Sequence, residues 1–150
     1  MESKIEIRKI LVPVDGSEDS FRAARFALDI ARLKNSKVTA LYVIHVPAYL
    51  IGGAEPGAVF LPRLDEEKKI GQEYVERVRG MGKEAGVDVQ TVVVDCCPSV
   101  VETITEYSKV NKIDLIVMGT KGRTGIKRFL LGSVADGVVT HAPCPVLVVR

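Results

Sequence analysis

Residues 114–136, DLIVMGTKGRTGIKRFLLGSVAD, contain the strongest indication of the fold. They open with a short apolar run, Asp114–Met118, that is typical of a strand buried on both faces. Glycines follow, and Ser133 is then expected to cap a helix. Backbone N–H groups converge where a glycine-rich turn meets a helix N-terminus. The stretch therefore predicts a site for phosphate or another anion.

The glycine spacing in this stretch differs from that of the common nucleotide motifs. Neither Gly-x-x-x-x-Gly-Lys-Ser/Thr nor Gly-x-Gly-x-x-Gly occurs in it. Between Gly119 and Gly132 there is no Asp or Glu, whereas four basic residues lie there: Lys121, Arg123, Lys127 and Arg128. The stretch thus carries a local positive field in a chain whose net charge is only +2.

Length and composition indicate one globular domain. A chain of 150 residues with 47% hydrophobic and 27% charged residues can bury a core without the support of disulfides or metals. A net charge of +2 and an aromatic content of 5%, without Trp, argue against nucleic acid as a partner. The uncharged stretch Val38–Ala54 is interrupted by Pro47, Gly52 and Gly53, so we expect no membrane span. The charged N-terminus lacks an apolar signal region, and we expect a cytoplasmic protein.

The cysteines and histidines do not have the spacing of a metal site. Cys96 and Cys97 are adjacent, Cys144 is distant, and only His45 and His141 could assist them. We therefore expect free thiols and no structural metal.

Apolar periodicity predicts strands and helices in alternation along the chain. The expected strands cover residues 9–14, 37–46, 87–94, 114–118 and 145–150, and the expected helices cover 17–35, 66–85, 99–109 and 133–141. A long loop, Pro47–Pro62, separates the second strand from the second helix. This order is typical of an α/β fold: a single-domain open parallel sheet with helices on both faces. Ligands of such sheets lie beyond the carboxyl ends of the strands, which here brings Asp15, Val43–Val46 and Gly119 around one crevice.

The sequence resembles the ATP-binding branch of the universal stress protein family over nearly its whole length. Four blocks carry the resemblance: Ile10–Ser17, Asp114–Gly119, Leu131–Val134 and Pro145–Val149. The family's motif Gly-x2-Gly-x9-Gly-Ser/Thr is matched by Gly119, Gly122 and Gly132-Ser133. The resemblance implies a five-stranded, Rossmann-like sheet of the adenine nucleotide alpha hydrolase type, with strand order 3-2-1-4-5. It also implies a homodimer formed through the last strand, Val146 to Val149.

The same resemblance implies an ATP site with Mg²⁺ held through the phosphates. The residues expected around ribose and phosphates are Gly119, Gly122, Gly132, Ser133 and Val134, with Arg123 as a neighbouring candidate. Those expected on the adenine and ribose side are Pro13, Val14, Asp15, Val43 and Met118. Asp15 has the chemistry to accept from a ribose hydroxyl or to organise hydrated Mg²⁺.

No arrangement of nucleophile, base and orienting group is apparent, and we predict no catalytic residue. The sequence favours an ATP-binding regulatory homodimer of the stress response. It leaves two alternatives open, a slow ATP hydrolase and a nucleotide-free dimeric scaffold.

Overall fold

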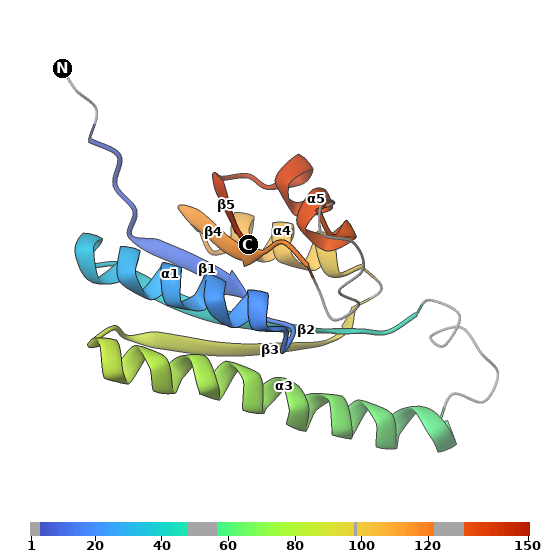
Figure 1. Cartoon of the computed structure of the whole chain (residues 1–150). Helices are drawn as coiled ribbons and strands as arrows, with labels where there is room; N and C mark the ends of the chain where they lie inside the picture. Colours follow the sequence, from blue (N-terminus) through green and yellow to red (C-terminus); the bar gives the residue numbers. More distant parts are fainter. Residues whose placement is uncertain (1–3, 48–56, 98, 122–130) are drawn as a thin grey trace.

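The protein is built on one parallel sheet. The computed structural model describes residues 4–47, 57–97, 99–121 and 131–150. These residues form five strands: β1 (Lys9–Pro13), β2 (Lys37–His45), β3 (Val89–Cys97), β4 (Leu115–Gly119) and β5 (Val146–Val149). All neighbouring strands are parallel, and their order is β3-β2-β1-β4-β5 (Figure 1). The fold class and strand order expected from the sequence are confirmed.

Helices cover both faces of this sheet. On one face lie α1 (Glu18–Lys34) and α3 (Gly57–Ala85), and on the other lie α4 (Val100–Val110) and α5 (Ser133–His141) (Figure 1). Each pair encloses its own apolar core. Ile10, Val12 and Val117 point into the core under α1 and α3, while Leu11 and Ile116 point into the core under α4 and α5. The strands alternate their side chains between the two cores, which explains their almost continuous apolar sequences.

Residues at the helix ends cap α1 and α4. Ser17 accepts a hydrogen bond from the N–H of Ser20, and Asn35 closes α1 in the left-handed conformation at φ 56°. Ser99 accepts from the N–H of Glu102 at 3.2 Å, which is one half of a capping box.

Two predicted boundaries were wrong. Helix α3 begins at Gly57, so the last six residues of the predicted loop 47–62 are helical; residues 48–56 of that loop lie outside the described part. Pro62 removes one helical hydrogen bond but does not end the helix, which continues for 23 residues in one uninterrupted run from Arg63 to Ala85. Strand β3 runs on to Cys97, because its pairing with β2 continues past Val94 as far as His45.

The described part of the chain contains no helix long and apolar enough to span a membrane.

Candidate functional site

The turn after β1 is fixed by the N-terminus of α1. β1 ends at Pro13, which has no N–H to donate to a neighbouring strand, and the next N–H, that of Val14, donates to the carbonyl of Leu41 at 2.9 Å. The half-buried carboxylate of Asp15 accepts from the N–H of Ser17 through Oδ1 at 2.9 Å. Ser17 in turn caps α1, so Asp15 is held at the carboxyl end of β1 by the cap of the following helix.

The end of β4 lies against this same first turn of α1. A Cβ added to Gly119 would lie 2.8 Å from the carbonyl carbon of Asp19, so the strand approaches the helix more closely than any side chain permits. The hydroxyl of Thr120 donates to Oδ2 of Asp19 at 3.1 Å. Gly119 therefore has a packing role as well as the ligand role expected from the sequence.

The two ends of the glycine stretch meet. The N–H of Gly132 donates to the carbonyl of Thr120 at 2.7 Å, which places the start of α5 beside the end of β4. Gly122 and Arg123, predicted to lie between these ends, fall outside the described residues.

The expected cap of α5 was wrong. Gly132, not Ser133, is the N-cap residue, because its backbone is extended at φ −58° and ψ 155° and its carbonyl accepts from the N–H of Asp136 at 2.9 Å. Ser133 is the first helical residue and is exposed. Unlike Ser17 and Ser99, Gly132 gives its helix no side-chain cap, so the first turn of α5 has N–H groups without such a partner.

The predicted apolar lining residues are distributed over both faces of the sheet. Val14 is buried in the core under α1 and α3, and Met118 is buried in the core under α4 and α5. Val43, near the carboxyl end of β2, and Val134, in the first turn of α5, are half-buried. The structure thus brings the backbone at these positions to the same sheet edge, while two of the side chains are committed to the cores.

An aromatic cluster supports the turn after Asp15. Gly16 has φ +86°, and a Cβ there would overlap the ring of Tyr74 on α3, whose hydroxyl oxygen would be 2.6 Å away. Tyr74 makes edge contacts with Phe21 and with Tyr42 at centroid distances of 6.0 and 5.8 Å. Tyr42 donates to Oε2 of Glu67 at 2.8 Å. Tyr74 lies in the helix expected over residues 66–85, but no sequence signal connected it with Gly16.

Comparison with known proteins decides the family. The model of the universal stress protein family matches residues 6–150. The chain belongs to the universal stress protein family. Universal stress protein MJ0531 of Methanocaldococcus jannaschii is 41% identical over 143 residues, which cover 95% of this chain and 82% of the relative.

Solved structures of the family share the fold of this universal stress protein. UspA from Lactobacillus plantarum matches with a TM-score of 0.81 at 30% identity, covering 98% of this chain and 100% of its own. A universal stress protein solved in complex with cAMP matches with a TM-score of 0.73 at 26% identity, covering 97% and 98%.

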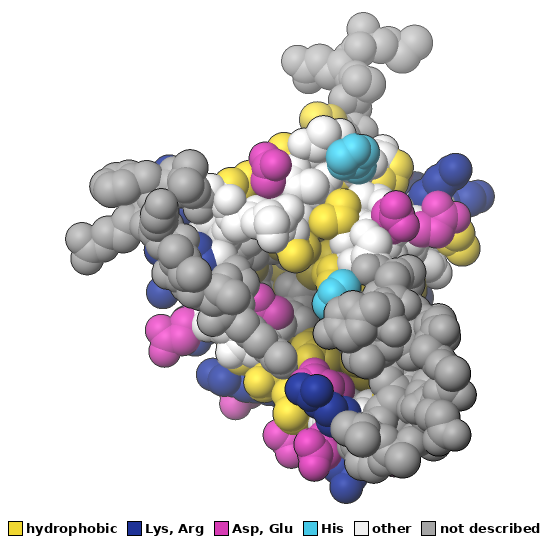
Figure 2. Space-filling model, turned by 90° about the vertical axis from the view of Figure 1, so that its right-hand side faces the viewer, with side chains coloured by type: hydrophobic (Ala, Val, Ile, Leu, Met, Phe, Trp, Pro, Cys, Tyr) yellow, Lys and Arg dark blue, Asp and Glu magenta, His cyan; other side chains and the backbone are white. Residues whose placement is uncertain are grey.

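The described residues near the centre of the edge where the strands end are mostly uncharged. Figure 2 looks onto this edge and shows apolar and uncharged side chains near its centre, with most charged groups toward the margins.

A salt bridge joins α3 to the carboxyl-terminal half of β3: Nζ of Lys68 lies 2.7 Å from Oδ2 of Asp95. The hydrogen bond from Lys68 holds the pKa of Asp95 below its ordinary value. Among the described residues, no three His, Cys, Asp or Glu side chains are grouped to hold a metal ion.

Proposed function

We propose that this universal stress protein binds ATP at the carboxyl ends of β1 and β4 and acts as a nucleotide-dependent regulatory homodimer. The observation that carries the nucleotide proposal is the 2.7 Å hydrogen bond from Gly132 to Thr120. It sets the first turn of α5, which has no side-chain cap, beside the glycine at the end of β4. Phosphate oxygens would satisfy those N–H groups and interact favourably with the helix dipole.

The remaining residues of the proposed site have complementary chemistry. Gly119, Gly122 and Gly132 would let the backbone approach phosphate, with Ser133 adding a hydroxyl donor and Val134 an N–H. On the other side, Asp15 would accept from a ribose hydroxyl next to Pro13, Val14, Val43 and Met118. Arg123 would add positive charge close to the phosphates. The relative in complex with cAMP supports an adenine nucleotide as the ligand class.

Mg²⁺ would be held through the phosphates. The donor set fits this arrangement, because the carboxylate of Asp15, held beside the end of β1 by Ser17, has the chemistry to accept from water around the ion. When bound, Mg²⁺ would neutralise phosphate charge, while the chain itself would orient the nucleotide through backbone N–H groups.

Calorimetry with ATP and Mg²⁺ tests the site. The wild-type protein should bind, and a Gly132→Val, Ser133→Ala variant should bind at least about tenfold more weakly, since it loses a close backbone approach and a hydroxyl donor. Gly80→Ala is a matched control because a Cβ at Gly80 meets nothing within 4 Å. A wild-type protein that gives no binding heat at millimolar ATP would refute the proposal.

The homodimer proposal rests first on β5. This strand has only four residues and lies at the end of the sheet, where its outer edge has no strand neighbour among the described residues. Stable dimers bury about 1,200–2,000 Å² in total, which is more than a pair of such short strands provides. A dimer through Val146–Val149 therefore needs further apolar surface nearby.

Helix α1 supplies such a surface. Phe26, Ile30 and Leu33 repeat at helical spacing, and Phe26 and Leu33 are 51% and 80% exposed. They lie on the flank of α1 opposite Phe21, which faces α3, and α1 also contacts β5. Leu147 is 37% exposed on the α1 side of β5, two residues before Val149 of the core under α1. We propose that this flank and β5 together meet a second copy of the chain.

Light scattering after size exclusion tests the dimer. Leu33→Lys and Leu147→Lys should each shift the protein toward monomer, because each places a charge in the proposed apolar contact. Val110→Lys is the control, since Val110 is also an exposed apolar residue, 67% accessible, but lies on α4. A monomeric wild-type protein at working concentration would contradict the dimer while leaving the nucleotide proposal standing.

A further inference from the structure

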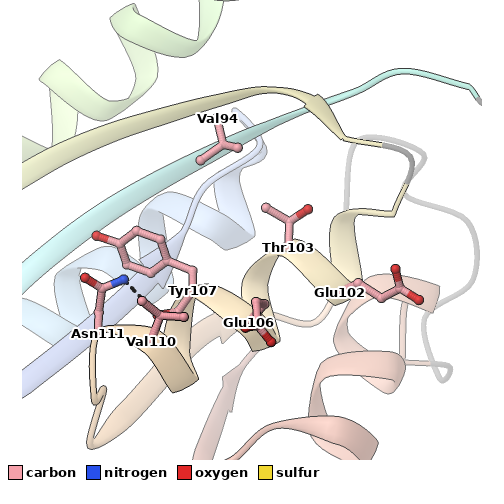
Figure 3. A pocket seen from close by; sticks show the side chains of 7 residues that line it. All are labelled: Val94, Glu102, Thr103, Glu106, Tyr107, Val110 and Asn111. Atoms are coloured by element: carbon pink, nitrogen blue, oxygen red, sulfur yellow. Dashed lines mark hydrogen bonds between the residues drawn. The ribbon is translucent and has the colours of Figure 1, made fainter. Parts of the chain in front are cut away.

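A groove lies between β3 and α4, on the sheet face opposite α3 (Figure 3). It has a volume of about 450 Å³ and is open to solvent. Val94 points into it from β3, toward the ring of Tyr107 on α4 (Figure 3). Val110 extends the apolar wall, and Glu102 and Glu106 add carboxylates to the lining. None of these residues belongs to the proposed nucleotide site.

The groove exists because α4 covers β2 and leaves β3 partly open. Ile104 of α4 is buried in the same core as Leu41 of β2. On the opposite face, α3 covers β3 and buries Val89. On the α4 side, Val92 and Val94 are only half-buried. One face of this edge strand is therefore apolar and only partly covered by its own helix.

Tyr107 forms a fixed aromatic wall in the groove. Its ring packs against the core under α4 and α5, and burial raises the pKa of its hydroxyl, so the phenol stays neutral at physiological pH. The side-chain amide of Asn111 donates to the carbonyl of Tyr107 at 2.9 Å and secures the end of α4. Val110, next to it, is 67% exposed. The apolar wall formed by Tyr107 and Val110 is thus held in place, and the Val110 side chain remains accessible to a partner.

The charges of the groove have one sign. Glu102 and Glu106 are exposed and lie one helical turn apart on α4, and no Lys or Arg is among the described residues that line the groove. This is the reverse of the chain as a whole, whose net charge is +2. An Arg or Lys side chain complements such a lining. Its aliphatic stem would pack on Val94 and Val110, and its charged head would meet the face of Tyr107 or the carboxylates.

The position of β3 favours an extended partner. Among the described residues β3 is the terminal strand of the sheet, with β2 as its one strand neighbour, so its outer edge presents backbone groups to which another strand can pair. We propose that the β3–α4 groove docks an extended basic segment of a partner protein, with Arg or Lys alternating with aliphatic residues on the side chains that face the groove.

Fluorescence anisotropy with designed peptides tests this docking site. The probe is a labelled ten-residue peptide in which every second residue is alternately Arg and Val and the others are Thr; its control carries Glu at the Arg positions. We expect the basic peptide to bind and the acidic one not to bind. Amide resonances of β3 and α4 should shift on binding, including those of Val94 and Tyr107.

Two variants separate charge from shape. Glu102→Gln with Glu106→Gln should weaken binding by roughly three- to tenfold at low salt, as two exposed ion pairs are lost, and should reduce its salt dependence. Val110→Lys should abolish binding because it fills the groove with a like charge. Leu33→Lys, on the far side of the sheet, should leave peptide binding unchanged.

Three results of the peptide assay would each overturn the proposal. These are absence of peptide binding at millimolar concentration, equal binding of the acidic peptide, and unchanged binding by Val110→Lys. Loss of self-association in Val110→Lys would also overturn it, because a second copy of the chain would then be the occupant. The peptide assay requires no nucleotide, so a failure of ATP binding does not affect it.

Discussion

The contact between Gly16 and Tyr74 offers the sharpest test of how the nucleotide turn is held. Gly16 follows Asp15 with φ +86°, and a Cβ there would overlap the Tyr74 ring. Gly16→Ala therefore has two costs. The left-handed backbone costs about 1–2 kcal/mol for a residue with a Cβ, and the overlap with the ring costs about 1–3 kcal/mol more. The expected loss in the free energy of unfolding is about 2–5 kcal/mol, within the total of about 5–15 kcal/mol of a typical domain.

A double-mutant cycle separates these two costs. Tyr74→Leu removes the ring atoms that meet the new Cβ, so Gly16→Ala in that background should cost only the backbone term of about 1–2 kcal/mol. The coupling free energy between the two positions should then be about 1–3 kcal/mol. Gly86 provides the matched control, since it also has positive φ, +71°, but a Cβ there meets nothing within 4 Å.

Urea unfolding followed by circular dichroism measures all of these variants. Gly86→Ala should cost about 1–2 kcal/mol with or without the Tyr74 ring. The Tyr74 ring does not restrict Gly16 if Gly16→Ala lowers the free energy of unfolding no more than Gly86→Ala does, or lowers it equally in the Tyr74→Leu background. Because Gly16 adjoins Asp15, the same substitution should also weaken ATP binding, and Gly86→Ala should not.

Three further predictions concern charges and a thiol. Asp114→Ala should destabilise the fold by about 1–3 kcal/mol in urea unfolding, because Oδ2 of Asp114 accepts from two backbone N–H groups at the start of β1, each at 2.9 Å. NMR titration should show that the lowered pKa of Asp95 rises in Lys68→Ala. Since the folded-state pKa lies below the unfolded value, the pair stabilises the fold at pH values above the ordinary pKa of 3.8 and loses this contribution as the pH falls through the folded-state pKa. For so exposed a pair the contribution to the free energy of unfolding is less than about 1 kcal/mol. Cys144 should react slowly with iodoacetamide at pH 7 and faster only at higher pH, because burial raises the pKa of its thiol; a rate that is flat between pH 7 and 9, followed by mass spectrometry of the peptide, would contradict this.

Most of the fold followed from local signals in the sequence. The five strands were apolar runs bounded by Gly, Pro or polar residues. Ser17 and Ser99 begin helices through side-chain hydrogen bonds, and Asn35 ends one in the left-handed conformation. The strand order, however, came from the resemblance to a family, because apolar periodicity alone does not say which strands pair. Pro62 was read as the end of a loop because an interior proline is unfavourable in a helix, whereas it lies in the second turn of α3, which continues past it.

Only the backbone features of the candidate site, given by the glycine spacing, could be predicted from the sequence. Glycine spacing identified both ends of the stretch that Gly132 and Thr120 close, yet it assigned the cap of α5 to Ser133, because serine is the commoner cap. The fit of Gly119 against Asp19 and of Gly16 against Tyr74 depends on side chains distant in sequence. Such contacts produce no periodic pattern in the sequence, so they can be recognised only once the positions of the helices on the sheet are known.

The end of β4 also gives the proposed nucleotide site a physical connection to the proposed dimer edge. The N–H of Thr120 donates to the carbonyl of Val149, the last residue of β5, at 3.0 Å, while the carbonyl of Thr120 accepts from Gly132 at 2.7 Å. One residue, Thr120, thus bonds through its C=O to the start of α5, where phosphate would bind, and through its N–H to the strand that would meet a second copy. We expect a ligand that moves Gly132 to act on the end of β5 through this residue. Linkage requires that any resulting change in dimer affinity on ATP binding equals the change in ATP affinity between monomer and dimer, so the two proposals constrain each other quantitatively.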